Sequence, residues 1–286
     1  MKRFLKISFI FIIFSFFLYS SCSTSKFFYY PDKEVIYSPD TFKCRYEEVN
    51  FKAPDENTLN GWFIKPKSDT VKIIATILFL HGNGGNIGYQ FAPLALLAQN
   101  GFQGLVFDYV GYGKSEGKPS QEKVLNDAMR AVDYMVGRKD VTNTKLILFG
   151  QSLGGHLACV VAGKLHEQYA GKIPIDALVI EGAFTGHEEI AAYHGKKSYF
   201  APGFLTRALV PSKYDAIEYI GKIPEPKLVI HSTEDKVCPF FMGKELFEKA
   251  IDPKEFWEIK GSHIAACRLY PNEFVKKFTE IISTRK

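Results

Sequence analysis

Eight short apolar segments, spaced along the chain, constrain its fold more than any other feature. Residues 73–80, IIATILFL, are apolar almost throughout, as expected of a strand buried on both faces of a sheet. From this third segment onward, helical patterns alternate with the strand-like segments. This order predicts an α/β fold: an eight-stranded, mostly parallel sheet with helices on both faces. The predicted strands are residues 46–53, 59–66, 73–80, 104–109, 145–150, 177–184, 227–233 and 256–260.

The connections between these strands indicate where a site would lie. In a mostly parallel sheet, ligands bind beyond the carboxyl ends of the strands, so functional residues are expected in the loops that follow them. One connection, residues 185–226, is about 42 residues long and exceeds an ordinary crossover. We expect this insertion to form a small helical cap over the strand ends.

A serine between glycines follows the fifth predicted strand. Residues 150–154, GQSLG, match the pattern G-x-S-x-G, with the strand 145–150 before them and a helical segment after them. In this context a tight strand-to-helix turn exposes the serine hydroxyl, and the glycines let neighbouring backbone approach closely. Ser152 is therefore the candidate nucleophile, at the N-terminus of a helix whose free N–H groups favour negative charge.

A serine hydroxyl needs a base, and the base needs an orienting acid. In the chain order Ser…Asp…His, His263 follows the last predicted strand in the stretch GSHIAA. Asp235 follows the preceding strand, with Glu234 beside it as a rival. We prefer Asp235, because the pattern HSTEDKVCP puts it at the turn. The predicted triad is Ser152, Asp235 and His263.

The developing oxyanion requires two N–H donors. One should be the N–H of Leu153, directly after the serine, and the other should come from the loop 81–86, HGNGGN. Three glycines allow this loop to approach a substrate carbonyl, and the Asn83 N–H is our choice. His81, in the same loop, is expected to brace it rather than act as a base.

Together, the stretches HGNGGN, FDYVGYGKSEG, GQSLGG, HSTEDKVCP and GSH resemble the α/β-hydrolase superfamily over roughly residues 45–283. They are most similar to its serine-hydrolase branch, with prolyl-oligopeptidase-like and serine-aminopeptidase-like esterases and palmitoyl-protein thioesterases. The resemblance implies an α/β-hydrolase fold and cleavage of carboxylic esters or thioesters through an acyl-enzyme, with no metal or organic cofactor. A serine peptidase and a non-catalytic, membrane-tethered binding module are the alternatives.

The N-terminus has the features of a targeting segment. A basic start, with Lys2, Arg3 and Lys6, precedes the 13-residue apolar stretch 7–19 and the small residues around Cys22. That stretch is short for a membrane span and typical of a signal peptide. Residues 1–22 are thus a predicted signal peptide that resembles those of bacterial lipoproteins, with Cys22 as the lipidated residue. We expect a tether over 23–44 and the hydrolase domain over 45–286.

These features predict a protein of the bacterial cell envelope, lipid-anchored to a membrane; a soluble secreted or periplasmic protein and an uncleaved membrane anchor are the alternatives. Expected partners are a small-molecule or acylated substrate and the membrane. Three of the five net positive charges lie in the N-terminal segment, and the body has no Lys/Arg-rich run, which argues against nucleic-acid binding.

The remaining cysteines and histidines give weaker signals. If the loops of Asp235 and His263 are neighbours, Cys238 and Cys267 lie near enough to raise the question of a disulfide, which the sequence leaves open. His156 is expected to be an ordinary helix residue. His187 is expected at the surface of the cap, and not as a metal ligand.

Overall fold

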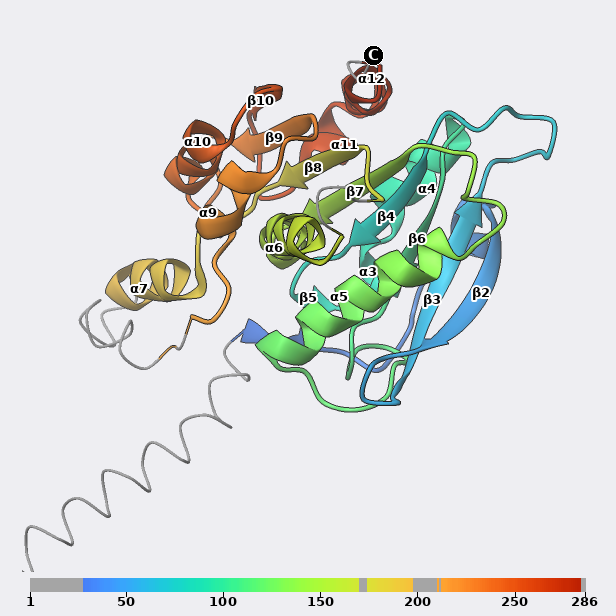
Figure 1. The fold of residues 1–286 in the computed structure, drawn as a ribbon, viewed down its shortest axis with the longest axis horizontal. Coiled ribbons are helices and arrows are strands. Elements are labelled where there is room, and N and C mark those ends of the chain that lie inside the picture. The colour runs from blue at the N-terminus through green and yellow to red at the C-terminus, as the bar shows by residue number, and fades with distance from the viewer. Residues whose placement is uncertain (1–27, 170–173, 198–209, 211, 284–286) are drawn as a thin grey trace, which may run out of the picture.

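The computed structural model describes residues 28–169, 174–197, 210 and 212–283. Its main sheet has eight strands in the order β10-β9-β8-β7-β4-β6-β3-β2, so all eight predicted strands are present (Figure 1). The six strands from β10 to β6 in this order pair in parallel. β3 is antiparallel to both β6 and β2, so β3 alone points the other way in this sheet. The bounds are β2 Arg45–Lys52, β3 Thr58–Lys65, β4 Thr76–Leu80, β6 Gln103–Phe107, β7 Leu146–Gln151, β8 Ala177–Glu181, β9 Lys227–Ser232 and β10 Lys254–Ile259.

The central strands are apolar over most of their length because both faces of the sheet are covered. Along β4, Ile77 and Phe79 belong to one hydrophobic core, whereas Leu78 and Leu80 belong to the other. Side chains alternate between the faces of a strand, so a continuous apolar run supplies both cores at once. Phe79 stacks on Phe149 of the neighbouring β7, with ring centroids 4.7 Å apart.

Helices form the two outer layers, as the alternating pattern predicts. One core lies between the sheet and α5, α6, α9 and α10, and the other lies between the sheet and α3, α4, α11 and α12. These helices are α3 Ile87–Gln90, α4 Ala92–Gln99, α5 Gln121–Val136, α6 Leu153–Gln168, α9 Ala216–Tyr219, α10 Phe240–Lys249, α11 Ala266–Leu269 and α12 Pro271–Ile281.

Helix α5 begins where its sequence predicts. The hydroxyl of Ser120, its N-cap, accepts a hydrogen bond of 3.3 Å from the Lys123 N–H. Its apolar stripe is buried, with the side chains of Val124, Ala128, Ala131, Val132 and Met135.

The described part of the expected tether packs on the domain instead of extending from it. Tyr29 is 5% exposed and belongs to the core, and β1, Tyr30–Pro31, pairs with β5, Gly84–Gly85. A short 3-10 helix, η1, covers Pro39–Phe42. The β1–β5 pairing was not predictable, because its two strands have only two residues each. The predicted signal peptide and Cys22 lie outside the described residues.

Within the predicted cap insertion, the structure describes α7, His187–Lys197, the short α9 and the 3-10 helix η2, Ile220–Lys222. Residues 198–209 and 211 of the insertion lie outside the described part of the chain. Across the described ranges, none of the helices combines the length and the hydropathy that a membrane span requires.

Candidate active site

The backbone of Ser152 makes a sharp turn between β7 and α6. β7 ends at Gln151, α6 begins at Leu153, and Ser152 between them has φ 56° and ψ −118°. A non-glycine residue in such a conformation costs on the order of 1–3 kcal/mol, and strain of this kind clusters at functional sites. The Ser152 N–H donates to the Glu181 carbonyl at 2.8 Å, which fixes the turn against the end of β8.

The glycines around this serine are required by close packing. A Cβ on Gly154 would overlap the carbonyl oxygen of Leu80 at the end of β4. A Cβ on Gly150 would overlap the Gly154 carbonyl, and one on Gly155 would lie 2.9 Å from the Ala183 Cβ. The spacing of the glycines thus lets α6 start directly against the ends of three strands.

Asp235, and not Glu234, contacts the imidazole of His263. The Asp235 Oδ2 lies 2.6 Å from the His263 Nδ1. The other oxygen, Oδ1, accepts from the N–H groups of Val237 at 2.8 Å and Cys238 at 2.9 Å, so the carboxylate is fixed on both sides. Glu234 turns away and accepts from the Gly261 N–H at 3.0 Å.

The second nitrogen of His263 has no partner. Its Nε2 is buried and makes no hydrogen bond with any described residue, the Ser152 hydroxyl included. The ring packs against Gly182, the residue after the Glu181 carbonyl that binds the Ser152 N–H: a Cβ there would lie 2.8 Å from the His263 Cε1. The Ser152 backbone and the His263 ring thus both contact the carboxyl end of β8, at the neighbouring residues Glu181 and Gly182.

The thiol of Cys238 lies beside Ser152. Burial raises the pKa of this thiol, the nearby Asp235 carboxylate raises it further, and a hydrogen bond with the Ser152 side chain lowers it. The raised pKa keeps the thiol protonated and a poor nucleophile at neutral pH. The sequence suggested this cysteine only as a possible disulfide partner. Cys238 and Cys267 are both free thiols in the structure.

Glu181 links the two loops that carry Ser152 and His263, and the sequence analysis missed it. Its Oε2 accepts from the side-chain amide of Gln151 at 2.7 Å, one residue before the serine. Its Oε1 accepts from the N–H of Ala266 at 2.8 Å, three residues after the histidine. Burial raises the pKa of this carboxyl. An acidic residue at the end of an apolar strand, in ALVIEGAF, was the available signal.

The loop 81–86 borders Ser152, as expected for an oxyanion loop. A Cβ on Gly82 would lie 3.5 Å from the Ser152 Cβ, so this backbone passes directly over the serine. The Asn83 carbonyl accepts from the Tyr112 hydroxyl at 2.8 Å, and its Oδ1 accepts from the Tyr30 N–H at 3.1 Å. Leu153 is the first residue of α6, where backbone N–H groups lack intrahelical partners.

His81 braces this loop, in line with its expected role. The ring is fully buried, stacks on Tyr109 with centroids 4.2 Å apart, and places Nδ1 2.7 Å from the Gly82 carbonyl. Burial lowers the pKa of His81 to about 4, so the ring is neutral near pH 7.

Of two further histidines, His156 lies on a helix as expected, whereas His187 differs from expectation. His187 is 4% exposed, and not at the surface, because α7 begins against α6 and the loop after β8. His156, on α6, is also buried, and its ring stacks on Phe184 with centroids 4.3 Å apart. The burial of His187 was not predictable because the cap sequence alone does not indicate which of its faces packs inward.

Comparison with known proteins agrees with this architecture. Residues 75–201 match the model of the alpha/beta hydrolase fold family. The uncharacterized protein YfhR of Salmonella typhi is 36% identical over 84% of this chain and 80% of its own length. The alpha/beta hydrolase domain-containing protein WAV2 of Arabidopsis thaliana is 30% identical over 74% of this chain and 69% of its own.

Among solved structures, the esterase Pf2001 of Pyrococcus furiosus superimposes with a TM-score of 0.72 at 20% identity, covering 90% of this chain and 97% of that one. At 20% identity, the likeness to this esterase shows a shared fold. The two sequence relatives, at 36% and 30% identity, show common ancestry. The chain described here belongs to the α/β-hydrolase superfamily.

Proposed function

We propose that this protein is a serine hydrolase that cleaves carboxylic esters or thioesters through an acyl-enzyme on Ser152. The observation that carries the proposal is the state of His263: Nδ1 is held by Asp235 at 2.6 Å, while the buried Nε2 has no hydrogen-bond partner among the described residues. A base in this position requires one nitrogen fixed by an acid and the other free to accept the serine proton.

The proposed reaction begins with rotation of the Ser152 hydroxyl toward the His263 Nε2. Hydrogen bonds between catalytic groups are often absent before substrate binds, so this adjustment is ordinary. Asp235 accepts the Nδ1–H and thereby keeps the lone pair on Nε2. As the Ser152 oxygen attacks the substrate carbonyl carbon, Nε2 takes the hydroxyl proton and the carbonyl oxygen becomes an oxyanion.

The N–H groups of Leu153 and Asn83 are proposed to stabilise this oxyanion. The support for Asn83 is that it follows Gly82, where a Cβ would lie 3.5 Å from the Ser152 Cβ, so this loop borders the serine. His263 then gives its proton to the leaving alcohol or thiol, which departs and leaves the acyl group on Ser152. A water molecule, deprotonated by the same nitrogen, releases the acid and restores the serine.

A substrate panel tests this proposal. We expect the purified chain to hydrolyse p-nitrophenyl esters and acyl thioesters, with a preference among acyl lengths, and to lose this activity in Ser152→Ala. Aminoacyl anilides are included to detect the alternative, a serine peptidase. Faster turnover of anilides than of esters would favour the peptidase. A folded chain that hydrolyses none of them would favour the third reading, a non-catalytic binding module.

We also propose that the chain is anchored to a membrane of the bacterial cell envelope through a lipid on Cys22. The support is the order of features in residues 1–22: basic residues, an apolar stretch and a cysteine after small residues. The wild-type chain, expressed in a bacterium, should incorporate radiolabelled fatty acid and sediment with membranes. Cys22→Ala should lose the label, and a variant that keeps it would contradict lipidation at this cysteine.

A further inference from the structure

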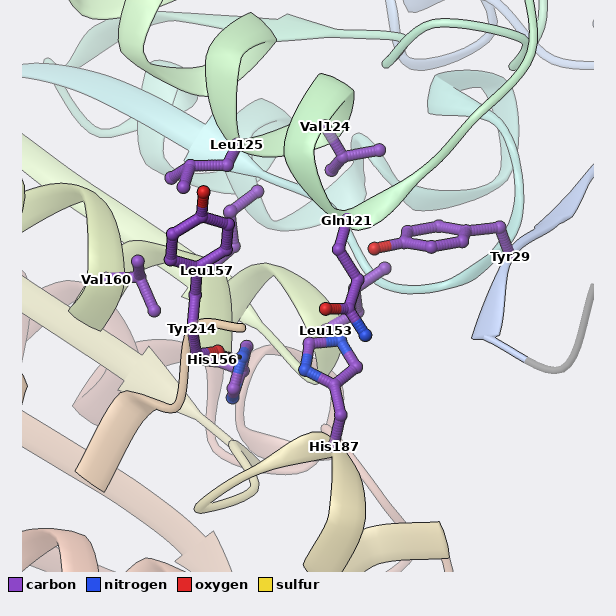
Figure 2. Close-up of a pocket in the computed structure, with 10 residues that line it drawn as sticks. All are labelled: Tyr29, Gln121, Val124, Leu125, Leu153, His156, Leu157, Val160, His187 and Tyr214. Atoms are coloured by element: carbon purple, nitrogen blue, oxygen red, sulfur yellow. Dashed lines mark hydrogen bonds between the residues drawn. The ribbon is translucent and has the colours of Figure 1, made fainter. Parts of the chain in front are cut away.

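A cluster of two histidines and one aspartate lies outside the proposed catalytic machinery. The potential ligand atoms of His156, His187 and Asp215 all lie within 4.8 Å of one another. His156 comes from α6, His187 begins α7, and Asp215 is the N-cap of α9. The cluster therefore joins α6 to two points of the predicted cap insertion, His187 near its start and Asp215 within it. Figure 2 shows the rings of His156 and His187 next to each other, beside Leu153.

His187 is the least explained group in this cluster. Both of its ring nitrogens are buried, and neither has a hydrogen-bond partner among the described residues. The ring instead meets three aromatic rings edge to face: those of Phe28, His156 and Phe184, at 5.0, 4.6 and 5.4 Å between centroids. A buried polar group without a partner costs about 1–3 kcal/mol of stability. Two such nitrogens on one ring therefore indicate that a ligand or ion binds next to them.

His156 has the opposite difficulty. Its Nδ1 lies 3.2 Å from the Phe184 carbonyl oxygen, and its Nε2 lies 3.0 Å from the Tyr214 carbonyl oxygen. A neutral imidazole has a single N–H, so one of its nitrogens directs a lone pair at a carbonyl oxygen. If the ring turned so that this lone pair left the carbonyl oxygen, the lone pair could bind a cation instead.

Asp215 supplies the negative charge of the cluster. Its Oδ1 accepts hydrogen bonds from the backbone N–H of His187 at 3.1 Å and from the Ser212 hydroxyl. The carboxylate packs closely on Gly186, where a Cβ would lie 2.6 Å from the Asp215 Cγ and 2.9 Å from its Oδ2. The glycine before His187 thus allows the carboxylate to approach the two imidazoles.

From these contacts we propose that His156, His187 and Asp215 form a binding site for a divalent transition-metal ion of the zinc type. Two imidazoles and one carboxylate are a known ligand set for such ions, with a fourth position for water or another ligand. Ligand atoms around a tetrahedral zinc ion lie about 3.4 Å apart, so binding requires side-chain shifts of roughly 1 Å. Burial lowers the pKa of both histidines, which leaves neutral rings with lone pairs for a metal.

A proton on His156 is the competing explanation. An imidazolium would satisfy both facing carbonyls and pair with Asp215. It would leave both nitrogens of His187 without partners among the described residues. The metal accounts for His156 and His187 together.

The bound ion would connect the start of α7 and the N-cap of α9, both in the cap insertion, to α6, the helix that begins after Ser152. Its expected effect is on the stability of the cap, because the three ligands come from three separate elements. The site is also distinct from the proposed triad, so its test does not depend on hydrolysis.

Metal binding to the full chain, without a histidine tag and purified in detergent, tests this proposal. After removal of metal with a chelator, the wild type should take up one equivalent of Zn²⁺, with a rise in Tm. Co²⁺ should give the visible absorption bands of a tetrahedral site. The variant His187→Phe keeps an aromatic ring among Phe28, His156 and Phe184 and removes both nitrogens. It should bind more than about 100-fold more weakly.

His194→Phe, on the same helix α7 but outside the cluster, is the matched control and should bind like the wild type. Ser152→Ala should do so as well, whether or not the protein is a hydrolase. Asp215→Asn gives a second ligand variant in case His187→Phe does not fold, and it should also weaken binding. Equal uptake by the wild type and the ligand variants, or no uptake by the wild type, would overturn the proposal.

Discussion

Asp235 and Glu234 are adjacent carboxylates with separate structural tasks. Asp235 is 8% exposed and holds the His263 imidazole at 2.6 Å, whereas Glu234 accepts from the backbone N–H of Gly261. A carboxylate that accepts the Nδ1–H fixes the tautomer of the base. A carboxylate that accepts from the backbone only shapes the loop. Comparing amide variants of the two separates these tasks.

We predict that Asp235→Asn lowers kcat for a p-nitrophenyl ester by about 10⁴-fold. The asparagine amide would donate to Nδ1 and leave the hydrogen on Nε2, so His263 could no longer accept the serine proton. Glu234→Gln should stay within a few-fold of the wild type. Steady-state kinetics on the two variants, with circular dichroism to verify folding, measure this. Equal losses in both variants would contradict the assigned roles.

The sequence located the proposed triad at residue level because the chain order and the strand ends leave few positions for each member. It did not locate Glu181, Cys238 or the buried His187. Glu181 contacts residues 30 positions earlier and 85 positions later, and such long-range contacts leave no local pattern. The sequence also favoured Asp235 over Glu234 from its place in the turn, and the 2.6 Å contact between Asp235 and the His263 Nδ1 agrees with that choice.

At the scale of secondary-structure elements, the junction of β7 and α6 depends on backbone contact without side chains. A Cβ on Gly154 would overlap the Leu80 carbonyl at the end of β4. A Cβ on Gly137, the C-cap of α5, would meet only ordinary contacts at 3.5 and 3.6 Å. Both residues are glycines at helix ends, so Gly137 is a matched control for a substitution at Gly154.

We predict that Gly154→Ala lowers the free energy of unfolding by about 3 kcal/mol, because the methyl group forces α6 away from β4. Gly137→Ala should change it by less than about 1 kcal/mol, with a gain expected from reduced freedom of the unfolded chain. Urea denaturation followed by the fluorescence of Trp62 and Trp257 measures both. A Gly154→Ala variant as stable as the wild type would show that the junction tolerates a side chain.

The long elements were predictable because their patterns are strong: strands buried on both faces are continuously apolar, and α5 has both a capping serine and an amphipathic stripe. β1 and β5, with two residues each, were not. Their pairing depends on contacts across more than fifty residues, including the Tyr30 N–H on the Asn83 side chain. For this reason the sequence indicated a free tether where the structure has packed chain.

For the molecule as a whole, two buried carboxyls couple stability to pH. Asp127, on α5, is 2% exposed, and its Oδ2 accepts from the Val110 N–H at 2.8 Å. Asp108, after β6, is fully buried and accepts from the Ile87 N–H at 2.9 Å. Burial raises the pKa of each carboxyl to about 7. In the unfolded chain both would titrate near 4.

Between about pH 4 and pH 7 the folded chain therefore binds more protons at these carboxyls than the unfolded chain does. Their contribution to stability is full at low pH and is lost as the pH rises through 7. Buried His81, with its pKa lowered to about 4, acts in the opposite direction between pH 4 and 6.5. Comparing the wild type with a variant of one carboxyl separates the contribution of that carboxyl to the pH dependence of stability from the contributions of the other groups.

We predict that Asp127→Asn gains stability relative to the wild type as the pH rises from 4 to 8, by up to about 4 kcal/mol. The amide keeps an acceptor for the Val110 N–H and carries no charge at any pH. Glu122→Gln, on the exposed side of α5, is the control and should show little such change. Urea midpoints at several pH values measure the difference. A gap independent of pH would mean that Asp127 does not take up a proton on folding.

The central claim is that Ser152 is a nucleophile activated by His263, and covalent labelling tests it most directly. A fluorophosphonate probe should form one adduct per chain, which peptide mass spectrometry should locate on Ser152. The adduct should disappear in Ser152→Ala and form far more slowly in His263→Ala, while both variants remain folded. A folded wild-type chain that stays unlabelled, or an adduct on another residue, would contradict the account.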